Sequence, residues 1–144
     1  MKSETYPQFS FRLPEANVQA EFYHQARLVG MVCVLEFMSP AGRLDLVVLN
    51  DEADRLLCIV ECKRETRRSD FDQSAQVARY RQLGVPVLCL MMRDESASLV
   101  KRIMKEFVSN PEHTGVKLSD LNKIPKITRG QSRRFSRDAL WAEQ

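Results

Sequence analysis

Asp45, Glu61 and Lys63 are charged residues within apolar, strand-like runs, and their types and spacing suit them to chemistry. Asp45 lies inside RLDLVVL, while Glu61 and Lys63 end RLLCIVECK. Burying a charge without a partner is costly, so these residues need an explanation. Because side chains alternate across a strand, Glu61 and Lys63 should share one face while Cys62 points to the other. If the two runs pair in matching register, two carboxylates and an ammonium group converge, and such carboxylates suit a hard cation such as Mg²⁺.

A simpler interpretation applies to the same residues. An Asp and a Glu-x-Lys on strands commonly form an exposed face with a cross-strand salt bridge. The Glu-x-Lys pattern alone is weak, because both residues are among the commonest in proteins. The joint pattern favours chemistry: an Asp in one strand, Glu-x-Lys at the end of the next, and a helix before and after them.

The spacing of apolar residues predicts the elements that must position these side chains. We expect helices from Glu15 to Val29, from an Asp70 cap to about Leu83 and over 94–108, with strands over 31–38, 43–49, 55–63 and 85–92. The first three strands follow one another through short turns and predict an antiparallel meander. The helical crossover then brings the fourth strand into the same sheet. The predicted class is α/β: a single domain with a mixed four-stranded central sheet flanked by helices.

The composition agrees with one globular domain. The chain has 144 residues, of which 44% are hydrophobic and 28% charged. We divide it into an irregular lead-in (1–14), a core domain (15–108) and a basic C-terminal extension (109–144). No apolar run approaches the roughly 20 residues that cross a bilayer, and the N-terminal residues contain no secretory signal, so we expect no membrane association and a cytoplasmic location. The cysteines form no CxxC pair and are expected to be buried free thiols.

Positive charge gathers towards the C-terminus. The whole chain has a net charge of +3, whereas residues 115–138 contain seven basic and two acidic residues. A basic segment on a nearly neutral body suggests a polyanionic partner, although a solvated tail explains it equally well.

The runs RLDLVV, IVECK and QVARY resemble the PD-(D/E)XK nuclease superfamily, most closely its RecB-like and type I restriction endonuclease-like branches. In this resemblance Asp45, Glu61 and Lys63 are the catalytic motif. Gln76 and Tyr80 match the Gln-x-x-x-Tyr motif of the following helix. The likeness covers roughly residues 15–92, and the family's order of helix, three strands, helix and strand is the order predicted above. It implies a restriction endonuclease-like core.

The resemblance implies Mg²⁺- or Mn²⁺-dependent hydrolysis of DNA phosphodiester bonds. The implied metal ligands are the carboxylates of Glu21, Asp45 and Glu61 and the backbone carbonyl of Cys62. Glu15 is an earlier acid of the same helix and a weaker candidate than Glu21. Glu36, in the first strand, is either a further ligand or a strand-end charge. Lys63 would orient the attacking water and offset negative charge in the transition state.

The remaining implied roles concern DNA and assembly. Gln76 and Tyr80 would support Lys63 or contact a phosphate. The arginines expected to hold the DNA backbone are Arg64, Arg67, Arg68, Arg133 and Arg134. A homodimer or a larger DNA-processing complex fits the family. Two alternatives stay open: a non-catalytic DNA-binding or assembly module that keeps the nuclease fold, and a partner-binding protein unrelated to nucleic acid.

Overall fold

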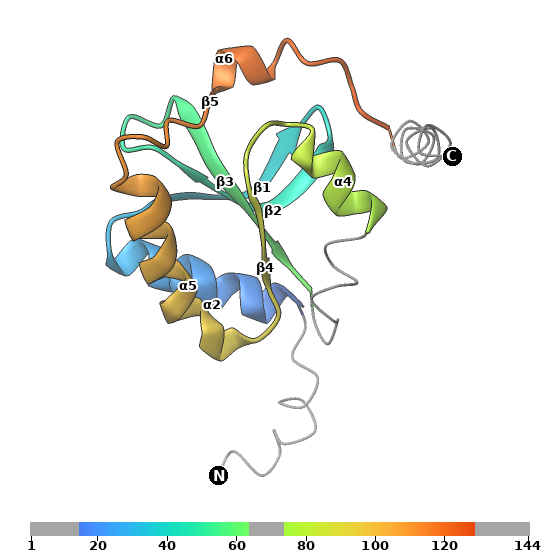
Figure 1. Ribbon diagram of the computed structural model, residues 1–144. Coiled ribbons are helices and arrows are strands. Elements are labelled where there is room, and N and C mark those ends of the chain that lie inside the picture. The colour runs from blue at the N-terminus through green and yellow to red at the C-terminus, as the bar shows by residue number, and fades with distance from the viewer. Residues whose placement is uncertain (1–14, 64–73, 129–144) are drawn as a thin grey trace, which may run out of the picture.

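The computed structural model describes residues 15–63 and 74–128. Its larger elements are α2 (Glu15–Leu28), β1 (Val32–Ser39), β2 (Gly42–Leu49), β3 (Arg55–Cys62), α4 (Ala75–Arg81), β4 (Val87–Leu90) and α5 (Ser96–Ile103) (Figure 1). A 3₁₀ turn, η1 (Arg93–Glu95), precedes α5, and a π-helical turn, η2 (Met104–Val108), follows it. The chain continues through the short elements β5 (Val116–Lys117) and α6 (Leu118–Leu121).

The strands form one open sheet in the order β1-β2-β3-β4. The β1–β2 and β2–β3 pairs are antiparallel, and the β3–β4 pair is parallel. The predicted α/β class, with a mixed sheet flanked by helices, is therefore observed. The sheet has five strands rather than four, because β5 pairs with the beginning of β3 through Arg55↔Lys117 and Leu56↔Val116. A strand of two residues is too short to leave an alternating pattern in the sequence.

Polar side chains close the turns between the antiparallel strands. In the β1–β2 turn, the Ser39 hydroxyl accepts a hydrogen bond from Ala41 N at 3.0 Å and donates one to Gly42 O at 2.7 Å. In the β2–β3 loop, Asn50 Oδ1 accepts hydrogen bonds from the backbone of Asp54 and Arg55, each at 3.0 Å. These local bonds set the register that brings β2 and β3 together.

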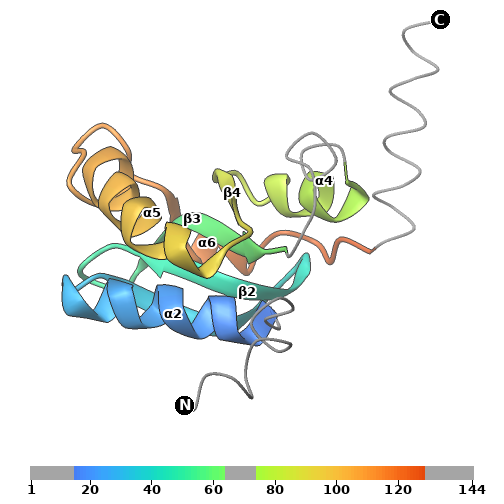
Figure 2. The same cartoon turned by 90° about the horizontal axis from the view of Figure 1, so that it is seen from below.

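The two faces of the sheet have separate cores. Phe22 of α2 and Ile103 of α5 pack with Val60 on one face, whereas Val77 of α4 packs with Ile59 on the other. Figure 1 shows α2 and α5 on one side of the sheet and α4 on the other, and Figure 2 shows β2 and β3 between α2 and α4.

The start of α4 differs from the prediction. The cap is Ser74, whose extended backbone precedes the helix and whose hydroxyl accepts from Val77 N at 3.1 Å, rather than Asp70. Asp70 and Ser74 are both common N-cap residue types, so the sequence alone did not decide between them.

The segment after η2 is part of the packed body. We call residues 116–128 the C-terminal strap. Its Leu121 is 1% exposed and joins the α4-side core, and Ile124 and Ile127 pack against that core. The backbone N–H of Ile127 donates to Pro40 O at 2.7 Å. The packed core thus continues to about residue 128, beyond the predicted core boundary at residue 108.

Gly115 allows the strap to approach β3. Its φ is +73°, and a Cβ at this position would clash with the Leu56 carbonyl oxygen. We expect Gly115→Ala to lower the free energy of unfolding by at least about 2 kcal/mol, because it adds a backbone clash to the roughly 1–3 kcal/mol cost of a positive φ. Gly30 is the matched control, since its φ is +77° and a Cβ there meets nothing within 4 Å. Urea denaturation of both variants measures the difference, and equal losses would contradict the close approach.

Candidate functional site

The β2–β3 pairing brings Asp45 and Glu61 together. The β2–β3 register ends at Leu46↔Val60, and Asp45 and Glu61 are the next residues along the two strands. Asp45 N donates to Glu61 Oε1 at 3.4 Å, and Cys62 N donates to Asp45 Oδ2 at 3.2 Å. These two contacts bring Asp45 next to Glu61, although no ladder pair joins the two residues.

Successive side chains of β3 point to opposite faces of the sheet. Cys58, Val60 and Cys62 are buried in the core on the α2 and α5 side. Ile59 belongs to the α4-side core, and Glu61 follows it on that face. Lys63 extends the ladder by donating its backbone N–H to Leu90 O at 3.0 Å. The carboxylate therefore faces α4, and the Cys62 thiol points away from it.

Glu61 is a buried acid beside a second acid. It is 2% exposed. Burial is the main cause that raises its pKa to about 8, and the negative charge of Asp45 adds to this. The Asp45 backbone N–H and the positive charge of Lys63 act in the opposite direction and lower the pKa. Lys63 thus lies close enough to stabilise the Glu61 carboxylate, and a cation between the two acids would relieve their repulsion.

Tyr80 connects α4 to this pair. Gln76 Nε2 donates to the Tyr80 hydroxyl at 3.0 Å, and that hydroxyl donates to Arg43 O at 3.3 Å. Burial raises the pKa of Tyr80, and the charge of Glu61 raises it further. Gln76 and Tyr80, the two residues of α4 predicted for the site, are therefore hydrogen-bonded to each other. Tyr80 is also close enough to Glu61 for the charge of Glu61 to raise its pKa.

In α2, the residue that contacts Asp45 is Gln19, whereas Glu21 was the expected one. Gln19 Nε2 donates to the Asp45 carbonyl oxygen at 3.2 Å. Glu21 instead accepts from Gln25 Nε2 at 2.9 Å along its own helix. Across residues 15–63 and 74–128, no three Asp, Glu, His or Cys side chains gather in a group that could hold a metal ion. Glu21 is therefore not brought together with Asp45 and Glu61.

Glu15 is the acid of α2 that reaches this end of the sheet. It lies one helical turn before Gln19, and its charge is one of the causes that raise the pKa of the Cys62 thiol. Val18 and Phe22 lie four residues apart, so the sequence places them on one stripe of the helix, and both are buried. This apolar stripe indicates which side of α2 faces the sheet. The sequence gives no sign of the role of Gln19, because its side chain is uncharged and its bond is to the main-chain carbonyl of Asp45.

The Cys62 thiol is unsuited to metal binding. Burial, followed by the charges of Asp45 and Glu61, raises its pKa far above the ordinary range of a thiol. Only the thiolate binds metals well, so Cys62 fits a ligand set through its backbone carbonyl alone. This agrees with the carbonyl role assigned to it.

Glu36 lies at an irregular position of β1. The pairing of β1 with β2 omits Glu36 and Asp45, and Glu36 has a φ of +52°. Its carboxylate lies 3.6 Å from Arg43 Nη1, with both side chains largely exposed. An exposed ion pair of this kind contributes little stability. Glu36 is thus paired at the surface, away from Glu61.

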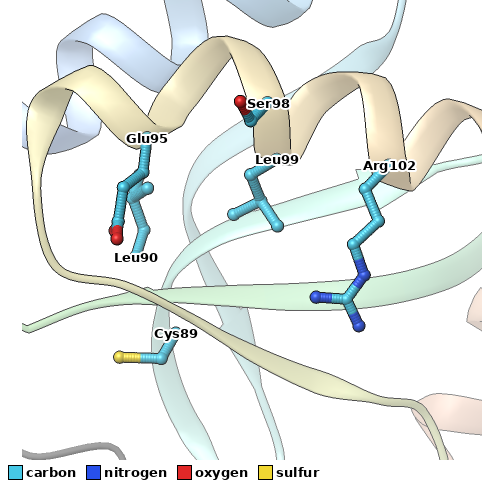
Figure 3. Close-up of a pocket in the computed structure, with 6 residues that line it drawn as sticks. All are labelled: Cys89, Leu90, Glu95, Ser98, Leu99 and Arg102. Carbon is cyan, nitrogen blue, oxygen red and sulfur yellow. The ribbon is translucent and has the colours of Figure 1, made fainter.

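A hollow of about 230 Å³ lies between β4 and α5 (Figure 3). Its lining residues are Cys89, Leu90, Glu95, Ser98, Leu99 and Arg102. The Glu95 carboxylate already accepts from Met91 N and Met92 N, each at 3.2 Å, and Arg102 pairs with Glu106 at 3.3 Å. Neither Asp45 nor Glu61 lines this hollow.

The arginines expected to contact DNA lie outside the described residues. These are Arg64, Arg67, Arg68, Arg133 and Arg134. Among the described helices, none combines the length and apolar character needed to span a bilayer. Comparison of the chain with protein-family models, curated proteins and solved structures finds no match. The nuclease resemblance therefore depends on the motif residues themselves.

Proposed function

We propose that this chain is a divalent-metal-dependent deoxyribonuclease that hydrolyses DNA phosphodiester bonds. The observation that supports this most directly is the buried Glu61 carboxylate, which lies against Asp45 and beside Lys63. A surface salt bridge between strands, the simpler interpretation of the same sequence pattern, would leave Glu61 exposed. A side chain that is 2% exposed with a raised pKa is typical of a functional carboxylate.

The oxygen donors at this position suit Mg²⁺ or Mn²⁺. Asp45, Glu61 and the backbone carbonyl of Cys62 would hold the ion, because hard cations favour carboxylate and carbonyl oxygens. When bound, the ion supplies a water of lowered pKa and stabilises charge on the scissile phosphate. We assign no acid of α2 to the site, because neither Glu15 nor Glu21 forms a group of three with Asp45 and Glu61 among the described residues.

The chain's own side chains then have distinct tasks. The positive charge of Lys63 lowers the pKa of Glu61 and so favours its ionised form, and the ammonium group would donate to an oxygen of the scissile phosphate, where negative charge grows during attack by water. Tyr80 and Gln76 fix α4 against the β1–β2 hairpin through the Arg43 carbonyl. Gln19 fixes the Asp45 backbone from the opposite face of the sheet.

A cleavage panel tests the proposal. Linear, nicked, branched and circular DNAs are incubated with the protein and Mn²⁺ or Mg²⁺, and the products are resolved on denaturing gels. We expect hydrolysis of at least one DNA form with either ion and none in EDTA. Absence of cleavage from every form with both ions would contradict the proposal.

Asp45→Asn should weaken Mn²⁺ binding without unfolding the protein. The amide keeps an oxygen that can accept the Cys62 N–H, but it removes the charge that attracts the cation. Loss of an outer partner of a metal ligand typically costs about 10–100-fold in metal affinity, so loss of a directly bound carboxylate predicts a decrease of at least about a hundredfold. Calorimetric titration with Mn²⁺ measures this loss, and Asp51→Asn, in the exposed β2–β3 loop, is the control. Equal affinity in Asp45→Asn and wild type would remove Asp45 from the ligand set.

The second candidate is a non-catalytic DNA-binding or assembly module. It is favoured by the lack, among the described residues, of a third acidic, His or Cys side chain grouped with Asp45 and Glu61. Such a module would bind DNA in a salt-dependent manner yet leave every DNA of the panel intact.

A further inference from the structure

The two helical layers of the protein carry different charges. On one face of the sheet, α2 and the helical segment 93–108 have five basic and five acidic residues, so their net charge is zero. On the other face, α4 and the C-terminal strap have five basic residues and one acidic residue, a net charge of +4. The basic residues of this second layer are Arg79, Arg81, Lys117, Lys123 and Lys126. Among these elements, positive charge is therefore concentrated on α4 and the strap.

The charged groups of this layer lie mainly at its surface. Lys117, Lys123 and Lys126 are exposed, and so is Arg81. Lys123 forms an exposed pair with Asp120, with 3.6 Å between Nζ and Oδ1. Arg79 is different, since it is buried and its Nε donates to Ala41 O at 3.1 Å. Most of the positive charge thus lies at the surface of this layer, while Arg79 bonds the hairpin.

This basic layer is continuous with the candidate site. The strap reaches the β1–β2 turn through the 2.7 Å bond from Ile127 N to Pro40 O. From α4, Tyr80 reaches the same hairpin at Arg43, two residues before Asp45. Figure 1 shows the strap and α4 approaching the hairpin on the same side of the sheet. The described strap also leads into residues whose sequence adds Arg129, Arg133, Arg134 and Arg137.

We propose that the C-terminal strap, with α4 and the β1–β2 turn, is the surface that holds the DNA backbone, and that the α2 and α5 layer faces away from the DNA. This inference rests on the proposed function, because it names the surface by which the DNA reaches Asp45 and Glu61. Lysines bind phosphates by displacing condensed counterions, so a layer of +4 attracts DNA, whereas a neutral layer does not.

Charge reversal on each layer tests the proposal. The strap variant is Lys123→Glu/Lys126→Glu, and the matched control is Lys101→Glu/Lys105→Glu on the helical segment of the neutral layer. All four lysines are exposed, and the two variants change the net charge equally. Fluorescence anisotropy with a labelled duplex, in EDTA to prevent cleavage, measures affinity at several salt concentrations. Lys123→Gln/Lys126→Gln serves as a milder strap variant, and thermal unfolding checks that each protein is folded.

The strap variant should bind DNA roughly tenfold more weakly than wild type near 0.1 M salt, and its log–log salt slope should be shallower by about 1.8, since each lost phosphate contact removes about 0.9. The control should bind within about twofold of wild type. Equal weakening of both variants, or weakening of the control alone, overturns the assignment of the surface. DNA cleavage by a strap variant with unchanged affinity would overturn this inference and leave the nuclease intact. DNA binding that depends on the strap but gives no cleavage would support this surface and contradict the nuclease proposal.

Discussion

Replacing Lys63 by alanine is expected to abolish DNA cleavage while leaving folding and DNA binding largely intact. Loss of one group that stabilises charge in a transition state costs about 10²–10³ in rate, and Lys63 also supports the ionised form of Glu61. The main-chain bond from Lys63 N to Leu90 O does not need the side chain, so the β3–β4 pairing should persist. Single-turnover cleavage of labelled DNA in Mn²⁺ measures the rate, and anisotropy measures binding.

The pH dependence of the Lys63→Ala variant separates two roles for this residue. If Lys63 acts only by keeping Glu61 ionised, its loss raises the pKa of Glu61, and a higher pH should restore cleavage. If it acts on the phosphate, as we propose, cleavage stays low at every pH. Lys105→Ala, an exposed lysine on the opposite layer, is the matched control and should cleave at the wild-type rate. Cleavage by Lys63→Ala within about threefold of wild type would exclude Lys63 from the chemistry.

The strands and the two central acids, Asp45 and Glu61, can be predicted from the sequence for a physical reason. A charged residue within an apolar strand is so costly that Asp45 and Glu61 are conspicuous in the sequence. Strand alternation then predicts which way Glu61 and Cys62 point, and the short Asn50 loop allows little freedom in how the two strands pair. The structure shows these residues as expected, with Cys62 in the α2 side core and Glu61 beside Asp45.

The errors arose where the sequence leaves several choices of similar cost. Glu15 and Glu21 are both acids of one helix, and the structure brings neither of them into a group of three with Asp45 and Glu61 among the described residues. The sequence favours an extension for the strap because its apolar residues, Leu121, Ile124 and Ile127, are separated by polar and basic ones. Their burial depends on contacts with α4 and β3, which are distant in sequence and leave no local pattern.

The second large effect is on stability and follows from Glu61. Its pKa is about 8 in the folded protein against an ordinary value of 4.5, so the folded state holds a proton that the unfolded state has lost between these values. The free energy of unfolding of the metal-free protein should therefore fall as pH rises through this window, by up to about 1.4 kcal/mol per pH unit. Above the folded pKa this contribution levels off.

Glu61→Gln should remove this dependence. The glutamine keeps an oxygen able to accept the Asp45 N–H, but it carries no charge to repel Asp45. Urea denaturation in EDTA between about pH 5 and pH 9 should give a smaller loss of stability for this variant than for wild type, with the difference largest at high pH. Glu21→Gln is the control, since Glu21 bonds Gln25 on the helix and should keep the wild-type profile. Parallel profiles for Glu61→Gln and wild type would contradict the burial of an ionisable pair at this site.

Mn²⁺ extends the same experiment to the proposed ligand role. A cation bound by Asp45 and Glu61 favours the ionised form of Glu61, so it should restore most of the stability that wild type loses at high pH. An ion at a hundred times its Kd adds about 2.7 kcal/mol to the free energy of unfolding. Glu61→Gln, which is already stable at high pH, should gain far less from the ion. An equal gain in both proteins would mean that Mn²⁺ binds elsewhere, and Glu61 would then be a buried acid without a metal-binding task.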